Sequence, residues 1–425
     1  MSTLLCAALI CLTAPPVLAG PVSVDGADFI DPDGEPVILR GLNVAQSSKR
    51  PPYLPWQTRQ DIATMANWGC NCVRMLIIWA AIEPRPGQYD VDYLAAMRQR
   101  LDWAHEAGLW VILDMHQDLY GEKFGGDGAP EWATVDGGLA YNPDRSLSWA
   151  AGYFEPAVIM AFENLWTDVP APDGKGLQDH FVAAWTHVAE VLGSHPAVIG
   201  YDLLNEPFYG NAFAYPEALA ALGELSEVLP EGANAMVLFS PARTEGAAEL
   251  LRDPERYFAA IDLGDDFFAR FERERLLPFY ERVVAAIREV TPDAIFFLEP
   301  HIAAASGANS FLQRTEGLAN VQLAYAPHFY DPGCAPGTPY DGNPERARLA
   351  FERMQQVSER LSAPVLLGEW GDAESPAETA QQYLRDQGRL LRQFGFSHCY
   401  WQYGPELTAR EGFPALLEAL SEDAP

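Results

Sequence analysis

Short apolar runs recur along the chain, and most are followed by a stretch whose apolar residues are spaced three and four apart. A short apolar run without alternation is typical of a strand buried on both faces, and the longer spacing is typical of a helix that covers a sheet. We expect strands at residues 38–45, 72–79, 110–116, 198–205, 294–299, 323–329, 364–370 and 398–403. We expect the clearest helices at residues 93–107, 179–193, 344–362 and 376–394.

This alternation predicts the architecture of the chain. Strands that alternate with helices form parallel sheets, and eight such units close into a (β/α)8 TIM barrel. The chain has 425 residues, and a barrel of this kind commonly takes about 250 residues or more as one domain. The last strand is followed only by a helix at residues 413–421. We therefore expect one α/β barrel domain over residues 20–425, with no appended β-sandwich.

Two connections are much longer than the roughly two to six residues usual between the strands and helices of such units. Residues 117–179 follow the third strand, and residues 209–275 follow the fourth. Both leave the carboxyl ends of strands, where long ordered loops build walls or lids. Residues 218–229 have the pattern of an amphipathic helix that would cover one side of a cleft, although plain packing explains the same pattern. A hairpin at residues 22–36 is expected to cap the opposite end of the barrel.

The N-terminus has the pattern of a signal peptide over residues 1–19. Its apolar centre, residues 4–12, is too short to cross a bilayer, and Val17-Leu18-Ala19 before Gly20 fits a small-residue cleavage site. No Lys or Arg precedes the apolar centre, which departs from the usual pattern. The sequence therefore predicts an exported protein, either periplasmic or extracellular.

Four cysteines follow the predicted signal peptide, namely Cys70, Cys72, Cys334 and Cys399. In an exported protein they can form disulfides in three pairings, or they can be buried free thiols, and the sequence leaves both open. No metal is expected at these cysteines, because Cys70 and Cys72 lack a second pair of ligands nearby.

The net charge narrows the choice of partners. Lys and Arg number 28 against 59 Asp and Glu, which gives a formal net charge of −31. A surface this acidic repels nucleic acid phosphates and anionic membranes, so neither is an expected partner. The sequence leaves transient contact with a lipid surface and the oligomeric state open.

Polar side chains stand where the predicted strands end. Because the carboxyl ends of barrel strands meet at one face, we expect these side chains to line one pocket. They are Arg74 in the second strand, His116 at the end of the third, Asn205 and Glu206 at the fourth, His328 and Tyr330 at the sixth, Glu369 at the seventh and Trp401 in the eighth. Two carboxylates from different β/α units are what acid/base or nucleophilic sugar chemistry requires.

This set of residues resembles the active site of glycoside hydrolase family 5, a family of retaining (β/α)8 enzymes. The resemblance implies that Glu206 is the general acid/base and that Glu369 is the nucleophile. It implies substrate-binding or supporting roles for Arg74, His116, Asn205, His328, Tyr330 and Trp401. No cofactor and no metal is implied, and the first strand reads Leu42-Asn43-Val44 where a barrel metallohydrolase would be expected to place paired histidines.

Within that family the chain is most similar to the endoglycoceramidases, which cleave the β-linkage between an oligosaccharide and ceramide. The resemblance is carried by Asp114-Met115-His116-Gln117-Asp118, by Lys49 followed by Pro51-Pro52-Tyr53, by Phe162-Glu163-Asn164-Leu165-Trp166, by Gly200-Tyr201-Asp202 and by Leu277-Pro278-Phe279-Tyr280. It implies that Lys49 and Asp118 bind the sugar next to the cleaved bond. The bacterial members usually carry a C-terminal β-sandwich, and this chain departs from them in ending soon after Trp401.

Other interpretations of the same residues stay open. Lys49 and Asp118 can be a solvated salt bridge, the histidines can be core residues, and the glycine cluster at residues 125–128 is too irregular for a phosphate loop and is interpreted as a flexible turn. The alternative functions are a β-glucosidase acting on other lipid or steryl glucosides, and a polysaccharide endo-hydrolase of the cellulase or mannanase type. A third alternative is an inactive barrel that binds carbohydrate or lipid.

Overall fold

The computed structural model describes residues 20–144, 149–228, 250–334, 339–372 and 376–421. The predicted signal peptide, residues 1–19, lies outside the described residues. Within the described ranges, no helix is both long and apolar enough to cross a membrane.

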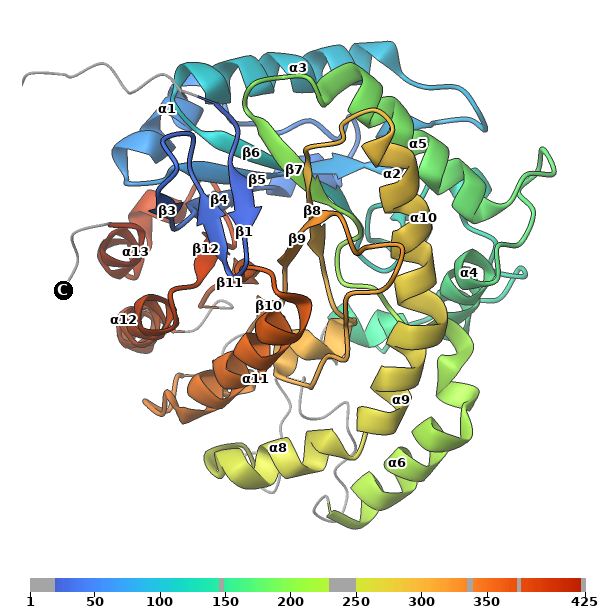
Figure 1. Ribbon diagram of the computed structural model, residues 1–425. Coiled ribbons are helices and arrows are strands. Elements are labelled where there is room, and N and C mark those ends of the chain that lie inside the picture. The colour runs from blue at the N-terminus through green and yellow to red at the C-terminus, as the bar shows by residue number, and fades with distance from the viewer. Residues whose placement is uncertain (1–19, 145–148, 229–249, 335–338, 373–375, 422–425) are drawn as a thin grey trace, which may run out of the picture.

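The core of the molecule is a curled parallel sheet (Figure 1). Its strands run in the order β10-β11-β12-β4-β5-β6-β7-β8-β9, and every neighbouring pair is parallel. The bounds are β4 (Arg40–Val44), β5 (Cys72–Ile78), β6 (Trp110–His116), β7 (Val198–Asp202), β8 (Ile295–Leu298), β9 (Gln322–Tyr325), β10 (His328–Phe329), β11 (Leu366–Trp370) and β12 (Ser397–Tyr400). All eight predicted strands are confirmed, and their ends lie within a few residues of the expected bounds.

The sheet closes into a barrel through its sixth strand. Two residues, including Pro327, separate β9 from β10, and proline has no N–H to donate to a neighbouring strand. Tyr325 at the end of β9 bridges to Val365, and His328 in β10 pairs with Glu369 in β11, so both parts lie against the seventh strand. The predicted sixth strand is therefore present as two segments, β9 and β10. The (β/α)8 architecture is confirmed.

Helices surround the barrel (Figure 1). Their bounds are α1 (Arg59–Asn67), α2 (Trp79–Ile82), α3 (Val91–Glu106), α4 (Pro156–Trp166), α5 (Leu177–Leu192), α6 (Pro216–Val228), α8 (Pro254–Asp262), α9 (Asp265–Phe271), α10 (Leu277–Arg288), α11 (Glu345–Leu361), α12 (Ala377–Phe394) and α13 (Phe413–Leu420). The first of them begins with a capping box, in which Thr58 and Asp61 each bond the other's backbone N–H. The predicted helices at residues 93–107, 179–193, 344–362, 376–394 and 413–421 correspond to α3, α5, α11, α12 and α13.

The N-terminal end of the barrel is capped by a small antiparallel sheet of β1 (Ser23–Asp25), β2 (Asp28–Ile30) and β3 (Pro36–Val37). Val22 and Phe29 from this segment join an apolar cluster with residues at the strand starts, such as Ile199 and Ile295. The predicted hairpin is thus confirmed, with one additional strand.

The two long connections carry their own helices on the catalytic side of the barrel. The first contains a short 3-10 helix (Trp149–Phe154) and α4. The second contains α6, α8, α9 and a π-helical turn (Glu272–Leu276) that leads into α10. In Figure 1 the helices α6, α8 and α9 gather at one edge of the molecule. The predicted amphipathic helix at 218–229 lies within α6 except for residue 229, which is outside the described residues.

All four described cysteines are buried, and Cys70, Cys72 and Cys399 are free thiols. The sulfur atoms of Cys72 and Cys399 lie 3.9 Å apart inside the barrel, on β5 and β12, and Gly41 of β4 pairs with both residues. Two strand spacings of about 4.8 Å put their Cα atoms roughly 9 Å apart, which exceeds the reach of a disulfide. Gly41 leaves room for both sulfurs, since a Cβ there would lie 2.7 Å from one and 3.0 Å from the other.

Candidate active site

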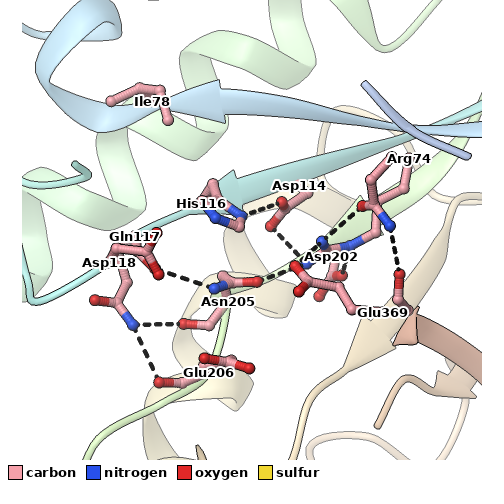
Figure 2. Close-up of polar contacts among 12 residues, drawn as sticks. Arg74, Ile78, Asp114, His116, Gln117, Asp118, Asp202, Asn205, Glu206 and Glu369 are labelled. Atoms are coloured by element: carbon pink, nitrogen blue, oxygen red, sulfur yellow. Dashed lines mark hydrogen bonds and ion pairs between the residues drawn. The ribbon is translucent and has the colours of Figure 1, made fainter. Parts of the chain in front are cut away.

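One arginine joins most of the strand-end residues. Arg74 projects from β5 into the barrel and is fully buried. Figure 2 shows its guanidinium among carboxylates and amides from the neighbouring strands. Its N–H groups donate to Asp202 Oδ2 (2.8 Å), Asn43 Oδ1 (3.0 Å), Glu369 Oε1 (2.9 Å), Asn205 Oδ1 (2.9 Å) and Glu299 Oε1 (2.8 Å), and Asp114 Oδ1 lies 3.0 Å away. The guanidinium therefore ties together residues from five neighbouring strands or the loops that follow them.

Glu369 is held by two donors. Arg74 Nη1 donates to Oε1, and the Tyr330 hydroxyl donates to Oε2 at 2.8 Å. The side chain is only 6% exposed. Both donors can stabilise negative charge on this carboxylate.

Glu206 lies in the loop that follows β7, in a strained backbone conformation. Its φ is +43°, which is uncommon for a residue with a side chain, and it is followed by Pro207. The backbone N–H donates to Glu299 Oε2 at 2.7 Å, and Oε1 lies 3.1 Å from His328 Nδ1. Gln117 Nε2 donates to the Glu206 carbonyl at 3.1 Å. Strain of this kind persists where the surrounding contacts impose it.

The carboxyl groups of the two glutamates lie close together. A carboxylate oxygen of Glu206, a ring nitrogen of His328 and a carboxylate oxygen of Glu369 lie within 4.8 Å of one another. This separation is close to the roughly 5 Å between the carboxyl groups of retaining glycosidases. The geometry therefore permits both carboxylates to act on a single anomeric carbon.

A second group of predicted residues lies beside the first. Lys49 Nζ is hydrogen-bonded to Asp118 and lies 4.4 Å from the centre of the Trp401 ring, while the His116 ring stacks on Trp401 with centroids 5.5 Å apart. The side chains of Lys49 and Asp118 are 19% and 14% exposed, so the pair is not a solvated surface salt bridge. Burial lowers the pKa of Lys49, but the neighbouring carboxylates outweigh it and raise the pKa above its usual value. An ammonium, a carboxylate and a flat indole face are the groups that bind sugar hydroxyls and rings.

Sequence reasoning missed two buried acids. Glu299 follows β8 and contacts both Arg74 and Glu206, as described above. A signal was available, because Glu299-Pro300 ends the fifth strand as Glu206-Pro207 ends the fourth. Asp127 lies beside Asp118, to which its backbone is joined by two hydrogen bonds of 2.9 and 3.1 Å.

The glycine cluster near Asp127 is not a loose turn, contrary to the interpretation from sequence. A Cβ on Gly126 would lie 1.7 Å from the Asp118 carbonyl oxygen, and one on Gly128 would lie 2.6 Å from Gln117 Cβ. Arg50 also donates to the carbonyls of Gly125 and Gly126. The glycines therefore allow a close backbone approach that presents Asp118 and Asp127 side by side.

The interior of the site holds more carboxylates than cations. Burial raises the pKa of Asp114 well above its usual value, against the opposing effect of Arg74, and burial raises the pKa of Glu299 to about 8. The carboxylates outweigh the effect of burial on Arg74 and keep it charged. Three groups of ligand-type atoms come within 4.8 Å in the described residues, around Glu206, Asp114 and Asp118, but Arg74 and Lys49 already supply fixed positive charge beside them.

The chain matches a known protein family. Residues 30–407 match the family model "Cellulase (glycosyl hydrolase family 5)". Among characterised proteins, the chain is 26% identical over 399 residues to endoglycoceramidase I of Rhodococcus hoagii (strain 103S), a match that covers 90% of this chain and 68% of that protein.

The chain is also similar to solved structures. Endo-glycoceramidase II from Rhodococcus sp. superposes with a TM-score of 0.68 at 30% identity, covering 90% of this chain and 76% of that chain, and it has also been solved as a ganglioside GM3 complex. An endogalactoceramidase superposes with a TM-score of 0.67 at 25% identity, covering 94% of this chain and 84% of that chain.

Replacement of Arg74 by Met should destabilise the fold strongly. The change leaves buried carboxylates uncompensated, which typically costs about 3–5 kcal/mol. In the variant those carboxyls take up protons at a higher pH when folded than when unfolded, so the loss of stability should shrink as the pH falls. Urea unfolding of wild type and Arg74→Met from pH 5 to 8 measures both effects.

The matched control is Arg385→Met, which removes an exposed arginine paired with Glu418 on the surface. It should change the free energy of unfolding little. A deficit in Arg74→Met that is equally large at every pH would contradict the uncompensated-charge explanation.

Proposed function

The chain belongs to glycosyl hydrolase family 5 and is a retaining O-glycosyl hydrolase, and we propose that it cleaves glycosphingolipids at the bond between glycan and ceramide. The observation that carries the proposal is the meeting of Glu206 and Glu369 within 4.8 Å at the carboxyl ends of two barrel strands. A buried pair of carboxylates at this spacing suits a double displacement with retention of configuration.

In the proposed mechanism Glu369 is the nucleophile. Its carboxylate attacks the anomeric carbon, the bond to the leaving oxygen breaks, and a glycosyl ester forms on Glu369. Arg74 and Tyr330, which both donate to this carboxylate, hold it in position before attack. Asn205, whose Oδ1 is bonded to Arg74, is positioned to hydrogen-bond a hydroxyl next to the reacting carbon.

Glu206 acts as the general acid and then as the general base. It gives its proton to the departing oxygen in the first step. In the second step it takes a proton from the water that attacks the glycosyl ester, so that sugar is released and Glu369 is ionised again. The contact between Glu206 Oε1 and His328 Nδ1 orients the carboxyl in both steps.

The proposed sugar and lipid sides of the site lie across the barrel from each other. Trp401 follows β12, Phe208 follows β7, and these strands are four places apart in an eight-strand ring. Lys49, Asp118 and Trp401 give one side polar and stacking groups that suit a sugar.

The other side begins at the acid and is apolar. Phe208, two residues after Glu206, contacts Phe154, and Phe154 is 44% exposed. Next to it Tyr153 contacts both Phe208 and Trp149, which is 58% exposed. The proton from Glu206 goes to the leaving group, so an apolar wall next to this residue suits a hydrophobic aglycone.

The substrate class can be tested with a panel of glycosylceramides, steryl glucosides, aryl β-glucosides and soluble glucans. We expect release of an intact oligosaccharide and free ceramide from glycosylceramides, with far slower turnover of glucans. Analysis of both products by mass spectrometry is the measurement. Rapid cleavage of glucans or steryl glucosides, without oligosaccharide release from ceramide, would contradict the proposed substrate.

The two catalytic roles predict different responses to leaving-group quality. Glu369→Gln should abolish turnover of every substrate, because no glycosyl ester can form. Glu206→Gln should lose on the order of 100-fold or more on the glycolipid and keep far more activity on an aryl glycoside whose leaving group needs no protonation. Steady-state rates on both substrates test this, and equal losses for the two variants on the aryl glycoside would reverse or refute the assignment.

We also propose that the protein is exported after removal of residues 1–19. The support is the apolar centre and the small residues before Gly20. Expression of the full chain in a bacterial host should give a secreted or periplasmic form. N-terminal sequencing should find Gly20 first, and recovery of a cytoplasmic protein that still begins at Met1 would contradict export.

A further inference from the structure

Glu299 lies directly beneath the proposed acid/base. Glu299 follows β8 and is only 1% exposed, and its carboxylate contacts three other residues. Oε2 accepts the backbone N–H of Glu206 at 2.7 Å, while Oε1 accepts from Arg74 Nη2 at 2.8 Å and lies 3.2 Å from His328 Nε2. No other described carboxylate contacts both the backbone of Glu206 and the imidazole that orients its side chain.

The backbone contact has a structural consequence. Glu206 has a φ of +43°, a sparsely populated conformation that persists only where neighbouring contacts impose it. A charge-assisted hydrogen bond from the Glu206 N–H to a buried carboxylate is among the stronger contacts available for that purpose. Glu299 therefore helps to impose the backbone conformation from which the Glu206 side chain contacts His328.

The imidazole contact has an electrostatic consequence. His328 lies between two carboxylates, with Nδ1 at 3.1 Å from Glu206 and Nε2 at 3.2 Å from Glu299, and Glu369 Oε2 is 3.6 Å from Nδ1. Burial lowers the pKa of His328, but these carboxylates outweigh it and raise the pKa well above its usual value. The charged imidazole is thus hydrogen-bonded to Glu206 through Nδ1 and forms an ion pair with Glu299 through Nε2.

The position of Glu299 is fixed by Tyr280, which has no part in the proposed mechanism. Tyr280, in α10, is fully buried, and its hydroxyl donates to the Glu299 carbonyl at 2.9 Å. Tyr280 ends the Leu277-Pro278-Phe279-Tyr280 phrase in the sequence. The helix α10 therefore reaches the proposed catalytic centre through Tyr280 and Glu299.

We propose that Glu299 is a positioning residue for acid/base catalysis, which holds the backbone of Glu206 and, through His328, the orientation of its carboxyl group. This inference rests on the proposed function. It assigns to Glu299 a role in both proton transfers, and no direct contact with the substrate.

The test compares Glu299→Gln with Glu272→Gln, a matched control. Glu272 is also a fully buried glutamate, and burial raises its pKa to about 7, as it raises that of Glu299 to about 8. The Glu272 carboxylate contacts Ser310 and the backbone of Phe311, and not the two proposed catalytic residues. Thermal unfolding confirms that each variant is folded before its kinetics are compared.

For Glu299→Gln we expect kcat/KM on the glycolipid to fall about 10- to 100-fold, since general acid catalysis contributes at least about 100-fold and is impaired rather than abolished. On a 2,4-dinitrophenyl glycoside of the same glycan, whose leaving group needs no proton, kcat/KM should change little. Azide, which attacks a glycosyl ester without a general base, should accelerate this variant on the activated substrate and yield a glycosyl azide. Glu272→Gln should show neither the leaving-group dependence nor the acceleration by azide.

A second measurement follows His328 directly. Replacement of Glu299 removes a negative charge 3.2 Å from its ring, so the pKa of His328 measured by NMR should fall in Glu299→Gln and not in Glu272→Gln. Equal losses of Glu299→Gln on both substrates, without an azide effect, would show a merely structural role and overturn the inference. Inactivity of the wild type on the glycolipid and on the activated glycoside would instead refute the proposed function.

Discussion

The site depends on one buried guanidinium. Arg74 is fully enclosed by the barrel, and its N–H groups are shared among carboxylates and amide oxygens from five surrounding residues. A buried cation is tolerated only when its charge is matched and its donors are satisfied. The strands that bring these oxygens to Arg74 are thereby held in one relative arrangement at their carboxyl ends. The same contacts that neutralise the arginine therefore position Glu369 and Asn205.

Much of this arrangement could be predicted from the sequence. Strand ends are local features, since an apolar run stops at a polar residue, and the barrel brings all carboxyl ends to one face. For that reason the neighbourhood of Arg74, Glu206, His328, Tyr330 and Glu369 follows from pattern and resemblance. The division of the sixth strand was not predicted, because the apolar run continues through Pro327 and only the missing N–H interrupts the pairing.

The missed residues depend on information that a linear pattern does not contain. Glu299 ends a predicted strand, but its importance comes from β8 lying next to β7, which brings its carboxylate under the Glu206 N–H. Asp127 lies in a connection whose course is set by backbone bonds to Asp118 and by glycines that allow close approach. The disulfide question likewise needed the register of β4, which separates Cys72 from Cys399.

The distribution of donors explains how two nearby carboxylates can take opposite roles. Carboxylates within 4.8 Å repel each other when both are ionised, and a proton on either one relieves the repulsion. Glu369 accepts from Arg74 and from the Tyr330 hydroxyl, two donors that can stabilise negative charge on the proposed nucleophile. The remaining acids beneath them are deeply buried, and burial raises the pKa of Glu299 and Asp114. Arg74 offsets this burial, since it stays charged and contacts both the interior acids and Glu369.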